Sequence, residues 1–174
     1  MREWIPVSTS PKGRLALAAV RAFGARPFDE VTVGELAAAA KVTTGTIYHH
    51  FGSKLSLYAF VREDVEQRLL DRMEGAIAAS TPASDRPAAV TAALLVGFDF
   101  AVREGFLHIL GAPPAGAGPD RLAEMLSVSA APASPIVARM LAAAWRTVLV
   151  AVAEGTEPQR ARAALLAFEL RTPS

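Results

Sequence analysis

The stretch KVTTGTIYHHFGSK, residues 41–54, holds a tyrosine and two histidines between threonines and lysines, and it contains no acidic side chain. The acid-free region is longer than this stretch, because no Asp or Glu lies between Leu36 and Arg62 in a chain with 17 acidic residues. A surface without carboxylates suits a negatively charged partner such as a phosphate backbone. The stretch therefore indicates binding of a polyanion.

Helix signals place this stretch in the fold. Thr32 and Glu35 have the spacing of a capping box, which predicts a short helix that ends at Ala40. Residues 41–43 then form a turn, and another helix follows to about His50. Two short helices joined by a three-residue turn are typical of a helix-turn-helix, whose second helix lies in the major groove of DNA.

The second of these helices has a polar outer face. With Ile47 taken as the inward direction and about 100° per residue, Gly45 and His49 point outward, flanked by Thr46 and Tyr48. These residues hydrogen-bond or allow close backbone approach, whereas a merely solvated face would carry Lys and Glu. The plain alternatives are relief of crowding at Gly45, a half-buried Tyr48 and a solvated His49. We interpret the face as one that reads DNA.

A lysine follows at the start of the next helix. Ser53 is placed to cap a long helix that reaches about Ala79, which puts Lys54 in its first turn. The helix dipole disfavours a cation there by up to about 1 kcal/mol. A phosphate would compensate this cost, which makes Lys54 a candidate backbone contact.

Composition and charge limit the class of protein. The 174 residues are 52% hydrophobic and 20% charged, which indicates a globular chain. The net charge is +1, but residues 1–60 sum to +3 and the remainder to −2, so the basic excess is N-terminal. The absence of cysteine and of an export signal favours the cytoplasm. The longest apolar stretch, residues 136–153, is interrupted by Arg139 and Arg146, so no membrane partner is expected.

The other helix-start signals and the Gly and Pro residues predict helices over almost the whole chain. Further helix starts are marked by Ser10-Pro11, Asp85-Arg86-Pro87, Pro119-Asp120, Ser134-Pro135 and the pair Thr156 and Gln159. Only the Gly- and Pro-rich residues 111–119 are expected to be irregular. The chain has no β pattern and no internal repeat. The predicted fold class is all-α, with an N-terminal three-helix DNA-binding domain and a helical C-terminal domain.

These residues resemble a known family. The segment TVGELAAAAKVTTGTIYHHFGSKLSL, residues 32–57, is similar to the DNA-binding domain of the TetR (tetracycline-repressor-like) transcriptional regulators. The shared pattern is Thr-Val before the second helix, Ala-Ala-x-Val-Thr in the turn, Gly-Thr-Ile-Tyr in the recognition helix and His-Phe-Gly-Ser-Lys after it. The resemblance implies an all-helical two-fold dimer, recognition helices spaced for successive major grooves, and a variable C-terminal domain that binds a small effector.

The face analysis and the resemblance together give the domain organisation and the DNA contacts. Residues 1–52 are expected to form the helix-turn-helix domain. Residues 53–174 are expected to form the effector-binding and dimerisation domain, with 53–79 as the connecting helix. The expected partner is double-stranded DNA with an inverted repeat. The candidate DNA contacts are Thr32, Lys41, Thr43, Thr44, Gly45, Thr46, Tyr48, His49 and Lys54.

Two positions depart from the family pattern, which usually has Gly where this chain has Lys41 and Pro27. The turn at Lys41 is expected to be left-handed, which costs a non-glycine residue roughly 1–2 kcal/mol. The Lys41 ammonium is a candidate phosphate contact, and simple tolerance of the turn is the alternative. Pro27 cannot take a positive φ, so the loop there must run differently from that of the family.

The C-terminal part offers a candidate effector pocket. Residues 90–110 are apolar nearly all round, which predicts one helix sandwiched inside the domain. Its polar residues form two pairs with i,i+4 spacing, Asp99 with Arg103 and Glu104 with His108, which suit ion pairs along one helix. The alternative is a pocket for an apolar effector, although its aromatic residues are equally typical of plain core. Its candidate lining is Phe98, Asp99, Phe100, Phe106, His108, Met125 and Trp145.

Small residues predict a dimer interface in the last two helices. The helix over residues 136–153 contains three consecutive alanines at 142–144, and the last helix has a side rich in Ala and Leu. Two such helices from each subunit would meet across a two-fold axis. The candidate interface residues are Ala142, Trp145, Leu149, Ala161, Ala164, Leu165 and Phe168.

The sequence bears on three classes of function. The favoured hypothesis is a dimeric repressor, released from its operator by a small apolar effector. An enzyme is disfavoured, because His49 and His50 diverge by about 100° on a helix and cannot ligate one metal ion. The chain also lacks an H-E-x-x-H motif, a cysteine nucleophile and a phosphate-binding glycine pattern, so neither a metal nor a cofactor is expected. The alternative is a helical protein-interaction module that no longer binds DNA.

Overall fold

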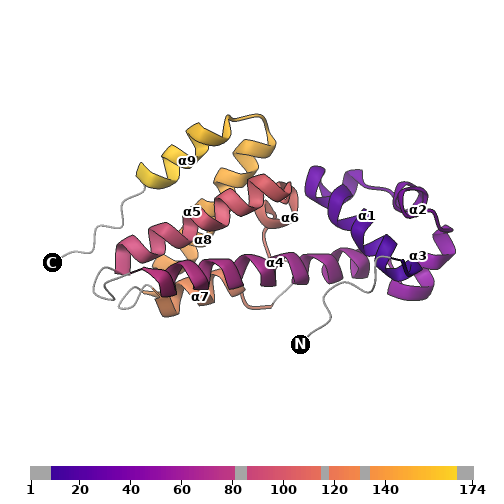
Figure 1. Cartoon of the computed structure of the whole chain (residues 1–174), viewed down its shortest axis with the longest axis horizontal. Helices are drawn as coiled ribbons and strands as arrows, with labels where there is room; N and C mark the ends of the chain where they lie inside the picture. Colours follow the sequence, from indigo (N-terminus) through magenta and orange to yellow (C-terminus); the bar gives the residue numbers. More distant parts are fainter. Residues whose placement is uncertain (1–8, 81–85, 115–117, 130–133, 168–174) are drawn as a thin grey trace.

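The computed structural model describes residues 9–80, 86–114, 118–129 and 134–167. Its elements, in chain order, are α1 (Pro11–Ala25), the 3-10 turn η1 (Phe28–Glu30), α2 (Val33–Ala40), α3 (Thr44–Phe51), α4 (Lys54–Ala79), α5 (Arg86–Glu104), α6 (Leu107–Gly111), α7 (Arg121–Ser129), α8 (Pro135–Ala153) and α9 (Pro158–Ala167). The described part contains no strand, which confirms the predicted all-α class. Helices α1–α3 form one end of the molecule, and the long α4 runs from them along the C-terminal helices (Figure 1).

Side-chain caps start the N-terminal helices where the sequence predicts. Ser10 Oγ accepts a hydrogen bond from the backbone N–H of Gly13 at 3.0 Å, and Ser53 caps α4 in the same way. Thr32 and Glu35 form the predicted capping box, with reciprocal side-chain-to-backbone bonds of 3.2 Å and 2.8 Å. These caps fix the first turns of α1, α2 and α4, because they satisfy N–H groups that have no partner within the helix.

The helix expected over residues 90–110 is interrupted, so that prediction was wrong. α5 ends at Glu104, Gly105 has a φ of 73°, and α6 begins at Leu107. A positive φ of this size is open to glycine at little cost and ends the helix. The predicted pair of Glu104 and His108 is therefore divided between two helices.

The other predicted pair is also replaced. Arg162 of α9 bonds to Asp99 at 3.1 Å, and Arg103 instead contacts its neighbour Glu104 at 3.2 Å. Asp99 thus connects α5 to α9, two elements that are far apart in the sequence. All four side chains are substantially exposed, so the two ion pairs contribute little to stability.

Aromatic side chains join α4 to the N-terminal helices. The rings of Phe23 in α1, Phe28 in η1 and Tyr58 in α4 form a cluster with centroid distances of 5.8, 5.0 and 5.1 Å. Further along, α4 packs against α5. The indole N–H of Trp145 in α8 donates to the carbonyl of Leu94 in α5 at 3.0 Å. Because α4 contributes to both halves, the expected boundary between residues 52 and 53 remains a prediction.

The two halves also touch through their backbones. A Cβ added to Gly24 near the end of α1 would lie only 2.4 Å from the carbonyl oxygen of Gly105. Such a distance is incompatible with any side chain, so glycine at position 24 allows α1 to approach the α5–α6 junction closely. The backbone of α1 therefore lies very close to that of the C-terminal half at this point.

Helix α8 combines length with an apolar composition. Among the described residues it is the one helix that is long and apolar enough to cross a membrane, a test that core helices also pass. Its inward side is deeply buried in the protein, with Leu141, Trp145 and Leu149 each 2% exposed or less. Packing inside the protein therefore accounts for the apolar residues on this side of the helix.

Candidate nucleic-acid interface and pocket

Helix α3 is anchored by one side chain and presents the opposite face to solvent. Ile47 is completely buried, as the predicted inward direction requires. Gly45, Tyr48 and His49 are all exposed, and Tyr48 is 55% accessible although it is aromatic. The outer face thus has the composition and accessibility that base and phosphate contacts require.

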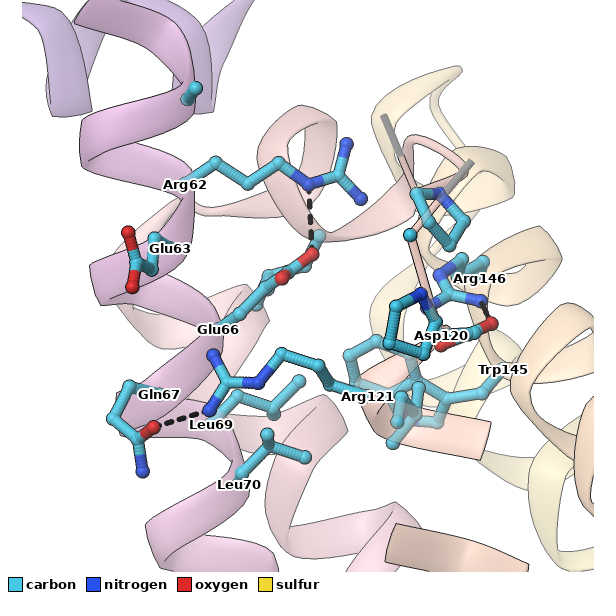
Figure 2. Close-up of a pocket in the computed structure, with 16 residues that line it drawn as sticks. Arg62, Glu63, Glu66, Gln67, Leu69, Leu70, Asp120, Arg121, Trp145 and Arg146 are labelled. Carbon is cyan, nitrogen blue, oxygen red and sulfur yellow. Dashed lines mark hydrogen bonds and ion pairs between the residues drawn. The ribbon is translucent and has the colours of Figure 1, made fainter. Parts of the chain in front are cut away.

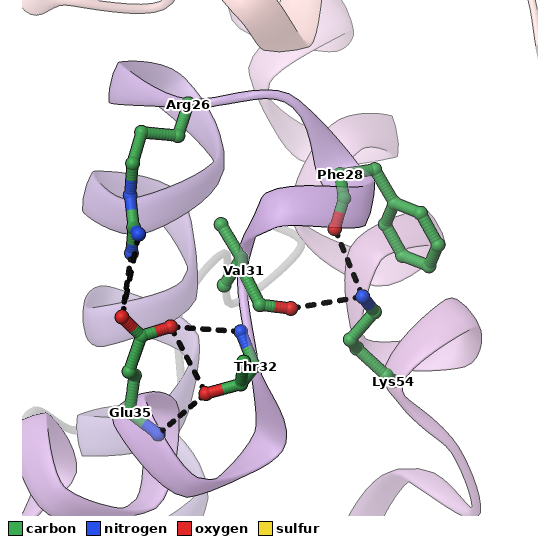
Figure 3. A network of polar contacts seen from close by, with 6 residues as sticks. All are labelled: Arg26, Phe28, Val31, Thr32, Glu35 and Lys54. Carbon is green, nitrogen blue, oxygen red and sulfur yellow. Dashed lines mark hydrogen bonds and ion pairs between the residues drawn. The ribbon is translucent and has the colours of Figure 1, made fainter.

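Threonines surround this face. Thr43 and Thr44 are exposed at the start of α3, and the Thr43 hydroxyl lies 3.1 Å from that of Thr46. The Thr32 hydroxyl is exposed but donates to Glu35 at 3.0 Å (Figure 3). All four hydroxyls lie on the helix-turn-helix, and contact of each with DNA remains a prediction.

Lys41 has the backbone conformation that the sequence predicts. It follows α2 with φ 55° and ψ 51°, and it is the one non-glycine residue with a positive φ among the described residues. Its backbone N–H bonds to the carbonyl of Ala38 at 3.1 Å and closes α2. The side chain is exposed beside α3, so its charge is available to a partner.

Lys54 has a different environment from the one expected. Its Nζ donates to the carbonyl oxygens of Phe28 and Val31 at 2.9 Å and 2.8 Å and lies 4.0 Å from the centroid of the Phe28 ring (Figure 3). Carbonyl groups and a ring face, and not phosphate, therefore compensate the cation at this helix start. One N–H remains for DNA, so a phosphate contact stays a prediction, but structural support is the role that these bonds indicate.

One carboxylate lies in the first helix of the helix-turn-helix and is held ionised. The backbone N–H of Thr32, then the Arg26 guanidinium and the Thr32 hydroxyl, lower the pKa of Glu35 to about 2. Arg26 contacts it at 3.3 Å. This negative charge is therefore committed to the cap of α2 and to Arg26, away from the acid-free face of α3.

Comparison with known proteins agrees with this geometry. The model of the tetR family of bacterial regulatory proteins matches residues 16–60, from α1 into the start of α4. The N-terminal part of this chain is a TetR-type DNA-binding domain. The resemblance of the sequence to TetR regulators is thereby confirmed, and the chain is a DNA-binding transcriptional regulator. A search of the curated proteins returns no match.

Solved TetR-family structures share the whole fold. A TetR-family transcriptional regulator from Pectobacterium atrosepticum has a TM-score of 0.66 and 22% identity, over 88% of this chain and 86% of its own. A TetR family regulator from Shewanella sp. PV-4 has a TM-score of 0.64 and 16% identity, over 91% of this chain and 95% of its own. The fold of the C-terminal half is therefore also that of TetR regulators.

The predicted effector pocket does not form as a single site. Four of its seven residues, Phe98, Phe100, Phe106 and Trp145, are at least 95% buried and belong to the core. Phe98 and Asp99 border a shallow groove beside α9 instead, and His108 and Met125 line neither that groove nor the larger pocket described below. The structure corrects this prediction because Phe100 and Phe106 fill the core, and the seven residues do not surround one cavity.

A different pocket lies between α4, α7 and α8. It has a volume of about 330 Å³, and of the predicted lining it includes only Trp145. Its apolar lining includes four leucines, and its polar lining is mostly charged (Figure 2). The polar residues of this lining are Arg62, Glu63, Glu66, Gln67, Asp120, Arg121 and Arg146.

One ion pair of this pocket lies along α4, and another joins α8 to the start of α7. Arg62 is 5% exposed, and its Nε bonds to Glu66 at 2.8 Å. The guanidinium of Arg146 in α8 donates hydrogen bonds to both carboxylate oxygens of Asp120, at 2.6 Å and 2.7 Å. Burial alone would raise the pKa of Asp120, but the hydrogen bonds from Arg146 and from the backbone of Ala123 outweigh it and lower that pKa below its ordinary value. Both carboxylates are therefore engaged with arginines.

Sequence reasoning missed these residues for identifiable reasons. Arg62 and Glu66 have i,i+4 spacing on the connecting helix, a signal that was available but is common on solvated faces. Asp120 and Arg146 are 26 residues apart and meet only through packing of α7 on α8. No local pattern identifies such a pair.

The predicted dimer residues face inward. Ala142, Trp145, Leu149, Ala161 and Leu165 are each at least 93% buried within the single chain, Ala164 is exposed, and Phe168 lies outside the described residues. The prediction selected the side of α8 that packs on its own chain, so for these five residues it is corrected. The exposed side of the last two helices instead carries Ile136, Met140, Val150 and Leu166.

Proposed function

We propose that this regulator is a homodimeric repressor that binds an inverted repeat and is released when a small ligand enters the pocket between α4, α7 and α8. The observation that supports DNA reading is the exposed, acid-free face of α3, with Gly45, Tyr48 and His49 in it. The protein acts by binding, without catalysis, in the cytoplasm. Residues 1–52 read DNA, and residues 53–174 bind the ligand and the second subunit.

Each residue of the face has a proposed role. His49 contacts a base edge, Gly45 allows the backbone to approach the groove, and the Tyr48 hydroxyl bonds to phosphate while its ring contacts a thymine methyl. Thr32, Thr43, Thr44, Thr46 and Lys41 contact phosphates at the sides of the groove.

The outward side of α8 supports the proposed dimer. Ile136, Met140 and Val150 share this side at helical spacing and are 67%, 58% and 38% exposed. Leu166 of α9 is 47% exposed. Large apolar side chains gathered in this way favour a partner surface, and two-fold pairing would cover them on both subunits. Such a dimer would place its recognition helices roughly 34–36 Å apart.

Selection of bound sites from random DNA tests the proposal. The enriched DNA should contain an inverted repeat, and His49→Ala should weaken binding to it by about 1–3 kcal/mol while affecting random DNA little. Glu74→Gln, at an exposed position near the end of α4, is the control and should change nothing. Failure to enrich any sequence would favour the interaction module that no longer binds DNA. An asymmetric single site would contradict the two-fold dimer.

A further inference from the structure

We propose that the pocket between α4, α7 and α8 binds a small organic monocarboxylate, with its carboxylate on Arg121 and its apolar body on Leu70, Leu122 and Trp145. The location rests on the proposed function, since this is the pocket assigned to the ligand that releases the repressor. The chemical class rests on the pairing of the charged groups in the pocket. It replaces the purely apolar effector expected from the sequence.

Three arginines line the pocket, and two of them already have a carboxylate. Arg62 is bonded to Glu66 at 2.8 Å, and Arg146 is bonded to Asp120 at 2.6 Å. Arg121 has no acidic partner among the described residues, and its guanidinium donates to the amide oxygen of Gln67. Arg121 is therefore the cation with the strongest unmet preference for a carboxylate, the group that its planar guanidinium binds in bidentate fashion.

The orientation of Gln67 strengthens this reading. Its Nε2 donates to Asp71 at 2.6 Å, which directs the amide oxygen, and not the amide N–H, toward Arg121. Arginine has five N–H donors, and this contact uses only part of that capacity. Gln67 thus presents to Arg121 a neutral oxygen in the position that a ligand carboxylate oxygen would take. Asp71 is exposed and bonds to Gln67, and it forms no ion pair with Arg121 among the described residues.

The remaining acid at the pocket does not favour a cationic ligand. Glu63 is exposed, and Figure 2 shows its carboxylate on the side of α4 that faces away from Arg62 and Glu66. Arg121, by contrast, extends from α7 across the pocket toward α4 (Figure 2). The guanidinium of Arg121 therefore extends into the pocket without an acidic partner, whereas the carboxylate of Glu63 points away from it.

The walls and the volume define the rest of the ligand. Leu70, Leu122 and Trp145 are 6%, 4% and 1% exposed, and they give the pocket an apolar side. The volume of about 330 Å³ is at the lower end of the range of about 300–1,000 Å³ for small-molecule sites. One spare guanidinium balances one negative charge. A compact acid with a single carboxylate fits this combination better than a phosphate dianion.

Calorimetry on the full chain tests the ligand class with matched probes. Phenylacetate, phenylacetamide, phenethylamine and phenyl phosphate differ mainly in the polar group, and hexanoate and octanoate vary the apolar body. We expect at least one of the three carboxylates to bind, and the amide and the amine to bind at least about tenfold more weakly than phenylacetate. Arg121→Gln should lose about tenfold in carboxylate affinity. Arg160→Gln, an exposed arginine on α9, should match the parent protein.

Each opposite result overturns the inference. Tighter binding of the amine or the phosphate, no binding of any carboxylate, or carboxylate binding that Arg121→Gln leaves unchanged would each contradict it. Arg121 is half-buried and should tolerate Gln, which thermal melting of the variant checks. DNA affinity is measured separately on the selected site without ligand. If the protein binds a carboxylate but not DNA, the repressor proposal is wrong and the ligand class stands. If it binds DNA but no carboxylate, the ligand class is wrong and the repressor proposal stands.

Discussion

The guanidinium of Arg62 donates a hydrogen bond to the hydroxyl of Tyr58 at 3.3 Å, and these two side chains connect the pocket with the aromatic cluster of the DNA-binding domain. Arg62 also bonds to Glu66 in the pocket and to the carbonyl of Ala112 after α6. The Tyr58 ring packs edge-on against Phe23. A displacement of Arg62 by a ligand would therefore act on the packing between α4 and α1.

The first prediction measures this connection. Tyr58→Phe keeps the ring and removes the acceptor, so it should lower the free energy of unfolding by about 1–2 kcal/mol, because a buried charged donor loses a partner. Urea unfolding of both proteins provides the measurement. Tyr48→Phe is the matched control, since its hydroxyl is on the exposed face of α3, and it should leave stability unchanged. If the two variants were equally stable, the bond from Arg62 to Tyr58 would contribute nothing to the free energy of unfolding.

The second prediction separates support from DNA contact at Lys54. Lys54→Met keeps the aliphatic stem but leaves two carbonyl oxygens without their donor and removes the cation above Phe28. We expect a loss of about 2 kcal/mol in unfolding free energy. Lys12→Met is the control, because Lys12 approaches the Phe51 and Phe60 rings only at 5.8 Å and 5.4 Å. A stable Lys54→Met protein that binds DNA more weakly, with a shallower salt dependence, would restore phosphate contact as the main role.

The third prediction concerns pH. Asp64 in α4 is 9% exposed, and neither of its carboxylate oxygens has a hydrogen-bond partner among the described residues. Burial raises its pKa to about 7, with Arg68 opposing the shift and Glu63 adding to it. The folded state therefore holds the proton more tightly than the unfolded state, whose ordinary value is 3.8. Its contribution to stability is thus greatest below pH 4 and is lost as pH rises toward 7.

Asp64→Asn tests this sign, because the amide cannot ionise. At pH 8 the variant should be more stable than the parent by about 1–3 kcal/mol; this advantage should be smaller at pH 5 and should vanish only below about pH 4, where the unfolded carboxyl is protonated as well. Urea unfolding at the two pH values provides the comparison. Asp29→Asn, an exposed position in η1, should show no such pH dependence. A parent protein that gains stability between pH 5 and pH 8, by an amount that Asn at position 64 removes, would reverse the argument.

The fourth prediction separates strain from charge at Lys41. Lys41→Gly relieves the left-handed strain and removes the ammonium, whereas Lys41→Ala removes only the ammonium. We expect the Gly variant to be more stable than the Ala variant by about 1 kcal/mol. If Lys41 contacts phosphate, both variants should bind DNA more weakly with a salt slope reduced by about one contact. Unchanged DNA affinity at every salt concentration would leave Lys41 as a tolerated strain.

The N-terminal helices were predictable because their signals are local. The cap at Ser10, the capping box of Thr32 and Glu35, and the left-handed turn at Lys41 each depend on residues within one turn of the chain. Exposure of the α3 face followed from helical periodicity once Ile47 was taken as the anchor. The partner of Lys54 was not predictable, because the carbonyls it binds belong to residues 23 and 26 positions earlier.

The C-terminal half was less predictable because its decisive contacts are long-range. Arg62 binds a carbonyl 50 residues away. A single glycine at position 105 divides the one helix that the apolar residues 90–110 predict. In α8 both sides are apolar, so residue type alone does not decide which side meets the same chain. Ala142 and Leu149 pack inside, and Met140 and Val150 remain outside.

The contact between Gly24 and Gly105 bears on how such proteins can be recombined. Joining residues 1–52 to the C-terminal half of another regulator would make a hybrid protein, but a half whose backbone approaches α1 as closely as Gly105 does accepts only glycine at position 24. A crossover after Gly111 would carry α1, α4, α5 and α6 together and keep the contact within one parent. The contact between Gly24 and Gly105 therefore decides which segment can be transferred between regulators, and the end of the DNA-binding motif does not.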